Sequence, residues 1–364
     1  MRKVVLLSVL SLIMIIVAGC GNKPATIQEY CRENFIMDTL IRIRVFSSDP
    51  ESGAKALDEA FAEFARIGNL SDKFAEKNLS EPEISDVYRV NKYAGIKAVK
   101  VSEDTLAMLE KSQYFADVSN GAFDVTVGPV MDLWGFGQAQ YHLPSDRELK
   151  QKLTLVGYMR IVINKQQKTV FLPQKGMSID LGGIAKGYAT DRAAQKLRQM
   201  GIKSAIINAG GNIYALGSKP DNSSWLAGIQ DPREKSRLAA IIKVNDTAVV
   251  SSGDYERYFI SKGIRYHHIL DPSAGKPARK AISTTIVAPS AADADVLSTA
   301  LFVLGPEKGM ALLEKLPGIK AVFIDEHKNI TYSPALQNQI DFTDGGGYQV
   351  ILKNHQVVPR IAGN

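Results

Sequence analysis

The feature of this sequence that most constrains its fold is a strand-to-helix transition through two glycines, in SIDLGGIAKGYATDRAAQKLRQMGI (residues 178–202). Apolar residues recur at helical spacing after the glycines. A glycine pair at such a junction lets a ligand approach the backbone closely, and a phosphate is the ordinary candidate. The spacing fits neither G-x-G-x-x-G nor G-x-x-x-x-G-K-[ST], because the glycines are Gly182, Gly183 and Gly187. A nucleotide bound here would need a fold other than the usual dinucleotide-binding one.

The rest of the chain mixes strand and helix patterns without regular alternation. Residues 39–46 alternate, with Ile41, Ile43 and Val45 on one face, which predicts a half-buried strand. Helical spacing predicts helices over 51–70, 105–118, 184–200 and 291–303, and the pattern of 161–172 predicts a β-hairpin. Further strands are expected near 204–207, 225–229, 241–244, 248–251, 284–288 and 322–324. Because no βαβ repeat is visible, we expect an α+β fold rather than a doubly wound sheet.

Size and charge set broad limits on function. The chain has 364 residues and is 45% hydrophobic, enough for a sizeable core in one large domain or two coupled ones. Its formal net charge is +6, but lysine and arginine are spread along the chain without a basic block. We therefore expect no nucleic-acid partner.

The N-terminus has the pattern of an export signal. MRK precedes an apolar run that ends in small residues before Cys20, and this resembles a bacterial lipoprotein signal. We expect residues 1–19 to be the signal peptide, Cys20 to be lipidated, and residues 20–29 to form a tether at the outer side of a bacterial cell membrane. The alternative is a single transmembrane anchor, for which the run is slightly short. With Cys20 lipidated, Cys31 has no intramolecular disulfide partner.

Two segments have residues suited to binding a flat ring and a phosphate. The stretch 122–137, which begins Ala122-Phe123-Asp124, is rich in aromatic residues and glycine and can stack a ring; otherwise it is a packed core turn. In the opening stretch, Asp180 can accept from a ribose hydroxyl or a ring N–H, and Lys186 can neutralise a phosphate. The alternative is that Asp180 caps the helix and Lys186 points to water.

Two further segments have residues suited to proton transfer and to metal binding. His267 and His268 are adjacent in a strand pattern, so one would face a site and the other solvent. The inward one suits general acid–base work, or is a satisfied structural histidine. Asp295 and Thr299 share a helix face, which suits a magnesium ion that also takes phosphate oxygens, or Asp295 merely favours the helix dipole. No zinc pattern and no G-x-S-x-G motif is present.

Together these segments resemble one family, the FAD:protein FMN transferases or ApbE family, formerly labelled thiamine-biosynthesis lipoproteins. The resemblance begins at Met37-Asp38-Thr39 and ends at ADVLSTALFVLG (294–305). Between them lie AFDVTVGP, DLGGIAKGYATDRA, NAGGNIYALG and HHILDPSAGKP, in this order. It implies an α+β fold with FAD in a cleft between two subdomains, a catalytic domain over 30–345 and a C-terminal segment over 346–364. It also implies magnesium-dependent transfer of FMN from FAD to a threonine of an acceptor protein, with release of AMP. The acceptors would be membrane redox subunits or exported flavoproteins.

The resemblance also implies roles for individual residues. His268 would be the base that takes the threonine proton. The metal ligands would come from Gly183, Asp295, Ser298 and Thr299, with main-chain oxygens near Gly183 and Ser298 contributing. FAD would contact Met37, Phe74, Ala122, Phe123, Asp124, Asp180, Lys186 and Ile269; many members have a tyrosine at the position of Phe74.

Two other functions fit the same residues. A magnesium-dependent FAD pyrophosphatase would use water in place of threonine and give FMN and AMP. A non-catalytic exported FAD-binding lipoprotein would need neither Asp295 nor His268, whose presence favours catalysis.

Overall fold

A ten-stranded sheet organises the computed structural model, which describes residues 26–74, 85–138, 140–343, 346–352 and 356–357. Neighbouring strands pair antiparallel except β17 and β19, which are parallel. In spatial order the strands are β1 (Gln28–Ile36), β2 (Thr39–Ser47), β6 (Ser204–Ala209), β7 (Asn212–Leu216), β10 (Thr247–Gly253), β15 (Ser283–Ala288), β16 (Lys320–Ile324), β17 (Asn329–Tyr332), β19 (Gln349–Leu352) and β20 (Gln356–Val357).

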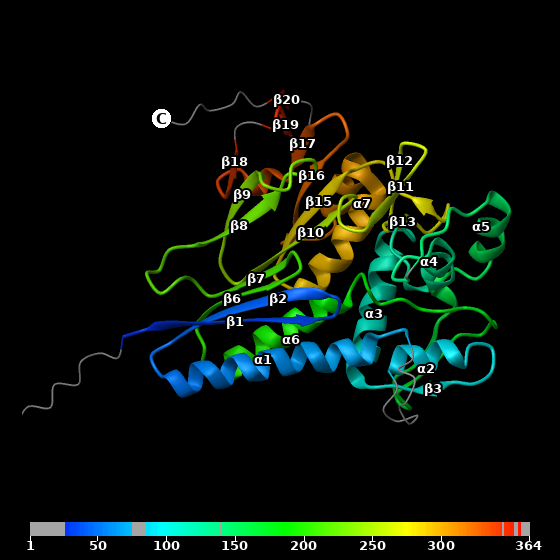
Figure 1. Ribbon diagram of the computed structural model, residues 1–364, viewed down its shortest axis with the longest axis horizontal. Helices are drawn as coiled ribbons and strands as arrows, with labels where there is room; N and C mark the ends of the chain where they lie inside the picture. The colour runs from blue at the N-terminus through cyan, green and yellow to red at the C-terminus, as the bar shows by residue number, and fades with distance from the viewer. Residues whose placement is uncertain (1–25, 75–84, 139, 344–345, 353–355, 358–364) are drawn as a thin grey trace, which may run out of the picture.

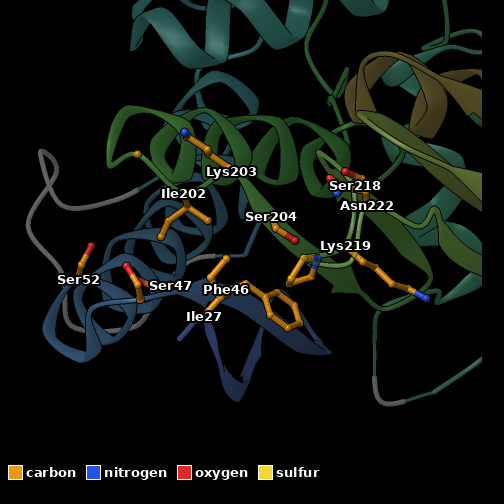
Figure 2. A pocket seen from close by; sticks show the side chains of 13 residues that line it. Ile27, Phe46, Ser47, Ser52, Ile202, Lys203, Ser204, Ser218, Lys219 and Asn222 are labelled. Atoms are coloured by element: carbon orange, nitrogen blue, oxygen red, sulfur yellow. The ribbon is translucent and has the colours of Figure 1, made fainter. Parts of the chain in front are cut away.

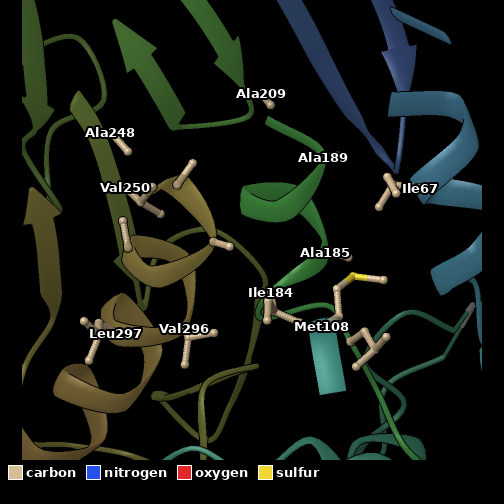
Figure 3. Packing of buried hydrophobic residues seen from close by; sticks show 14 of the residues in the cluster. Ile67, Met108, Ile184, Ala185, Ala189, Ala209, Ala248, Val250, Val296 and Leu297 are labelled. Atoms are coloured by element: carbon tan, nitrogen blue, oxygen red, sulfur yellow. The ribbon is translucent and has the colours of Figure 1, made fainter. Parts of the chain in front are cut away.

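Three helices, α1 (Pro50–Ser71), α6 (Ala185–Gln199) and α7 (Ala291–Leu313), cover one face of this sheet (Figure 1). The predicted alternation of β2 is confirmed, since Ile41, Ile43 and Val45 are fully buried beneath the helices. The small side chains of Ala185 and Ala189 on α6 are buried in the same apolar core (Figure 3). The other face packs against a small sheet of β8 (Trp225–Gln230), β9 (Leu238–Val244) and β18 (Ile340–Phe342).

Helix α7 extends beyond its predicted end near residue 303 because two helical segments join there. Gly305 has φ 77° and ψ 176°, which is not helical, and Pro306 starts the second segment, where its missing N–H is harmless. The first segment therefore ends close to the prediction. Within the described part of the chain, α7 alone has the length and hydropathy of a membrane-spanning helix, but most of it is buried inside the domain.

A second region lies beside the sheet, at the right of Figure 1. It contains α2 (Asp86–Lys92), α3 (Glu103–Val118), α4 (Gly128–Trp134), α5 (Asp146–Leu153) and the sheet β3 (Val99–Lys100), β5 (Thr169–Phe171) and β4 (Val162–Asn164). Two hairpins complete it: β11 (Tyr258–Ser261) with β12 (Ile264–His267), and β13 (Leu270–Asp271) with β14 (Lys276–Pro277). Single 3₁₀ turns are η2 (Val125–Val127), η3 (Tyr158–Arg160) and η4 (Pro334–Leu336).

The predicted α+β class is confirmed, and so are the helices over 51–70 and 105–118 and the hairpin in 161–172. The first strand begins at Gln28, two residues before the predicted domain start, and β19 adds part of the C-terminal segment to the large sheet. The predicted signal peptide and Cys20 lie outside the described residues. A flavin cleft between two subdomains stays a prediction.

Candidate functional site

The N-terminal half of α6 and the start of α7 are joined by backbone N–H groups that donate hydrogen bonds to two carboxylates. The Gly187 N–H donates to Asp295 Oδ2 at 2.8 Å. A Cβ on Gly187 would lie 2.2 Å from the Ala291 carbonyl oxygen, so only glycine fits this crossing. On the next turn of α6, the Asp191 carboxylate accepts from the N–H groups of Ala291 and Ala292, capping α7. The two helix starts are therefore held in fixed relative positions.

This junction brings the predicted metal-ligand residues together. A Cβ on Gly183 would lie 3.7 Å from Thr299 Oγ1 and 2.9 Å from the Phe123 ring, so the Gly183 backbone borders both side chains. Asp295 is buried on α7, one turn before Thr299. The Ser298 hydroxyl is occupied by hydrogen bonds with the Asp295 carbonyl oxygen and with Ser252 Oγ. The Ser298 main-chain oxygen is therefore the atom of this residue that would bind the metal, as the sequence predicted.

The donor set fits a hard divalent cation whose coordination shell also includes oxygens of a bound phosphate. It offers one carboxylate, one free hydroxyl and main-chain oxygens, all hard ligands that magnesium prefers. Among the described residues no group of three or more His, Cys, Asp or Glu side chains gathers around a common point. A protein site this sparse in charge suits magnesium, which keeps waters and substrate oxygens in its coordination shell.

Asp180 lies in an ion pair that the sequence did not reveal. Its Oδ2 is 2.8 Å from Lys73 Nζ, and its Oδ1 accepts from the Gly182 N–H at 2.9 Å. Lys73 also contacts Asp132 Oδ1 of α4 at 2.9 Å and is only 12% exposed. Burial raises the pKa of Asp180, but Lys73 and the Gly182 amide outweigh it, so the pKa lies below its usual range. The alternative that Asp180 caps α6 is wrong, because that helix begins at Ala185 without a side-chain cap.

The segment before α4 is held by Asp124. Its Oδ1 accepts from the N–H and hydroxyl of Thr126, and its Oδ2 accepts from the Tyr158 N–H. Burial raises the pKa of this carboxyl despite these bonds. Ala122 packs with Ile269 in one buried apolar cluster, so two predicted FAD contacts are neighbours.

Phe74 follows the end of α1, and Met37 packs against the last turns of the same helix. Phe74 is 46% exposed and lies against Gly137 after α4. Met37 forms the two-residue turn of the β1–β2 hairpin with Asp38, both at positive φ, and packs against Gly68 of α1. Their contacts with FAD stay predictions, as does that of Lys186, which is half-buried in the first turn of α6.

His268 is held at the base of the β11–β12 hairpin. Its backbone N–H donates to the Arg257 carbonyl oxygen at 3.0 Å, and its Nδ1 lies 3.2 Å from the same oxygen. A carbonyl can only accept, so Nδ1 carries the proton and Nε2 keeps a free lone pair. Burial and then the Arg257 cation hold the pKa of His268 far below its ordinary value. The imidazole is therefore neutral at pH 7 and able to accept a proton.

His267 has a structural role. It is 1% exposed, its Nε2 donates to the Ala278 carbonyl oxygen at 2.8 Å, and its Nδ1 accepts from the Ile269 N–H. We expected one imidazole to face inward and the other solvent, and the two do differ: His267 is buried, whereas His268 is partly exposed. The inward one, His267, packs edge-on against Phe302 of α7, because the hairpin lies on a buried apolar cluster.

Buried His267 predicts a loss of stability in acid. Burial lowers its pKa to about 4, against about 6.5 in the unfolded chain. Below pH 6.5 the unfolded chain binds more protons, so stability falls until the pH reaches the folded pKa. At pH 5 the free energy of unfolding is therefore lower by about 2 kcal/mol. We expect the urea midpoint of His267→Gln to fall less between pH 7 and pH 5 than that of wild type, because this contribution is absent. An identical pH dependence in both proteins would contradict the assignment.

A cavity of about 380 Å³ lies elsewhere, between the β2–α1 turn and the start of β6 (Figure 2). It is lined by residues that include Phe46, Ser204 and Lys219 and by none of the predicted site residues. The candidate site is therefore defined by the junction of α6 with α7, together with the His268 hairpin that packs on α7 at Phe302, and not by this cavity.

Comparison with known proteins gives a consistent result. The ApbE family model matches residues 37–323. The chain is 36% identical to the FAD:protein FMN transferase of Treponema pallidum over 354 residues, 93% of this chain and 96% of that protein. It is 34% identical to one from Klebsiella pneumoniae over 296 residues, 81% and 91% of the two chains.

Solved structures of ApbE proteins have a similar fold. The ApbE protein of Thermotoga maritima superposes with a TM-score of 0.78 at 34% identity, covering 86% of this chain and 99% of that one. The flavin transferase ApbE of Vibrio cholerae gives a TM-score of 0.76 at 27% identity, covering 86% and 100%.

Proposed function

This chain belongs to the ApbE family, and from that premise we propose that it transfers FMN from FAD to a threonine side chain of an acceptor protein, releasing AMP. It is a flavin transferase, and the acceptor residue and metal dependence are the parts that we propose. One observation supports them above others. The Gly183 backbone, just before α6, lies beside Thr299, which follows Asp295 by one turn on α7, and a helix N-terminus favours a bound phosphate.

We infer that magnesium is held by Asp295, Thr299 and main-chain oxygens of Gly183 and Ser298. When bound, the ion neutralises charge on the pyrophosphate of FAD. Lys186, in the first turn of α6, would add a second positive charge beside the same pyrophosphate. Asp180, ionised and fixed by Lys73, would accept a hydrogen bond from FAD.

The chain's own residues supply the base and its orientation. Arg257 fixes the tautomer of His268, so that Nε2 is free to take a proton from the threonine hydroxyl. As the threonine oxygen forms a bond to the FMN phosphorus, the bond between that phosphorus and the bridging oxygen breaks. The electron pair leaves with AMP, and the threonine proton stays on His268. The product is FMN joined to threonine by a phosphodiester.

The test uses the full chain in detergent with FAD, magnesium and an acceptor protein that carries a threonine flavinylation motif. Flavin fluorescence on the denatured acceptor band, with an equal amount of AMP, is the expected result. Free FMN and AMP with an unlabelled acceptor would instead favour the pyrophosphatase. FAD bound but unchanged would favour the flavin-binding lipoprotein.

We further propose that residues 1–19 are a signal peptide and that Cys20 is lipidated, which would place the enzyme at the outer side of a bacterial cell membrane. Its acceptors would then be membrane redox subunits or exported flavoproteins. Wild type should sediment with membranes, and Cys20→Ser should lose the lipid mass from its N-terminal peptide. An unmodified Cys20 in wild type would overturn this proposal.

A further inference from the structure

Stacked aromatic rings lie beside His268. Tyr141 stacks on Phe259 at 5.0 Å between ring centroids, Phe259 on Tyr266 at 5.3 Å, and Tyr266 lies 5.5 Å from Trp134. We call these four residues the aromatic ladder. Trp134 anchors its inner end, since its indole N–H donates to the Gly275 carbonyl oxygen at 2.7 Å. The ladder thus joins α4, the loop after it and the β11–β12 hairpin into one unit.

The ladder is continuous with the candidate base. The buried Phe136 ring lies 6.4 Å from the His268 ring and 5.7 Å from the Tyr141 ring. Only two ring contacts therefore separate His268 from the outer end of the ladder.

The outer end of the ladder is apolar and exposed. Tyr141 is 49%, Leu143 43% and Ile264 50% exposed. Ile264 pairs with Ser261, two residues along from the Phe259–Tyr266 pair, so Ile264 points to the same side of the hairpin as those rings. Apolar side chains gathered over separate elements at the edge of a site mark an interaction surface more often than isolated ones do.

We propose that Tyr141, Leu143 and Ile264 form the docking surface for the acceptor protein, contacting an apolar side chain next to the residue that receives FMN. This inference rests on the proposed function. Transfer requires the acceptor hydroxyl to come within about 3 Å of His268 Nε2. A protein interface of ordinary size covers about 800 Å² on each partner, a disc of roughly 16 Å radius. An acceptor seated over His268 therefore reaches the end of the ladder, where contact buries surface that is otherwise exposed.

The experiment compares three changes of one exposed apolar residue to glutamate in the full chain. Ile264→Glu and Leu143→Glu alter the surface from two separate elements. Leu226→Glu is the control, because Leu226 is 54% exposed on β8, away from the hairpin. For each protein the KM for the acceptor, kcat and the Kd for FAD are measured, and thermal unfolding checks the fold.

We expect Ile264→Glu and Leu143→Glu to raise the acceptor KM about tenfold or more, with kcat and the FAD Kd within twofold of wild type and the control unchanged. An unchanged acceptor KM in both surface variants would overturn the inference while leaving the transferase intact. A weaker FAD Kd with an unchanged acceptor KM would assign the surface to FAD instead. A wild-type protein that labels no acceptor would refute the proposed function itself.

Discussion

His268→Ala is expected to lower the rate of FMN transfer by about 10²–10⁴-fold, the usual contribution of a positioned general base. The Kd for FAD should change little, because the imidazole is proposed to act on the acceptor hydroxyl. Single-turnover labelling of the acceptor, beside fluorescence titration of FAD, separates the two effects. His327→Ala is the matched control, since that side chain is 77% exposed. A labelling rate within twofold of wild type would rule out His268 as the base.

The pH profile gives an independent check on the same residue. A base must be deprotonated, so activity is lost as the pH falls through its folded pKa. Because burial and Arg257 lower the pKa of His268, the acidic limb of kcat/KM should lie below pH 6.5. That limb should be absent from the residual activity of His268→Ala.

Asp295→Asn is expected to reduce metal-dependent transfer by about 10³-fold, since a metal at a transferring phosphoryl group provides several kcal/mol. Asparagine tests metal binding more selectively than alanine does, because its amide oxygen can still accept from the Gly187 N–H and keep α6 beside α7. FAD binding in the absence of metal should persist. Rates measured over a range of magnesium concentrations test this.

Asp293→Asn is the control for charge at the start of α7. Asp293 lies in the first turn of α7, two residues before Asp295, and pairs with Lys111. Its removal changes the interaction with the helix dipole but not the predicted ligand set, so its magnesium dependence should match wild type. Equal losses in the two variants would show that helix stability, not metal binding, explains the effect.

The elements that the sequence predicted are those with a local signal. The alternation of β2 and the apolar stripe of α6 are visible within a short stretch of sequence, because each element buries one face in the same apolar core. The first strand was missed because its residues are exposed on both faces and carry no alternation. The break in α7 depends on one glycine at positive φ before a proline, a local pair that periodicity alone does not weigh.

Site residues that depend on distant partners were not predictable in the same way. Lys73 reads as a surface lysine until the fold places it between Asp180 and Asp132, the former more than a hundred positions away in sequence. Asp191 likewise reads as a solvent-facing helix residue, yet it caps α7. His267 and His268 were singled out together, and only the packing of the hairpin shows which one is buried.

The hydrogen bond from the Gly187 N–H to Asp295 makes this amide a probe of the junction between α6 and α7. The third N–H of a helix ordinarily has no acceptor within the helix and exchanges rapidly with deuterium. Here that N–H is bonded to a carboxylate of another helix, so its exchange rate measures how often α6 and α7 separate. The nitrogen resonance of this single glycine also senses the charge on Asp295. It provides a spectroscopic probe of the site that needs neither flavin nor acceptor.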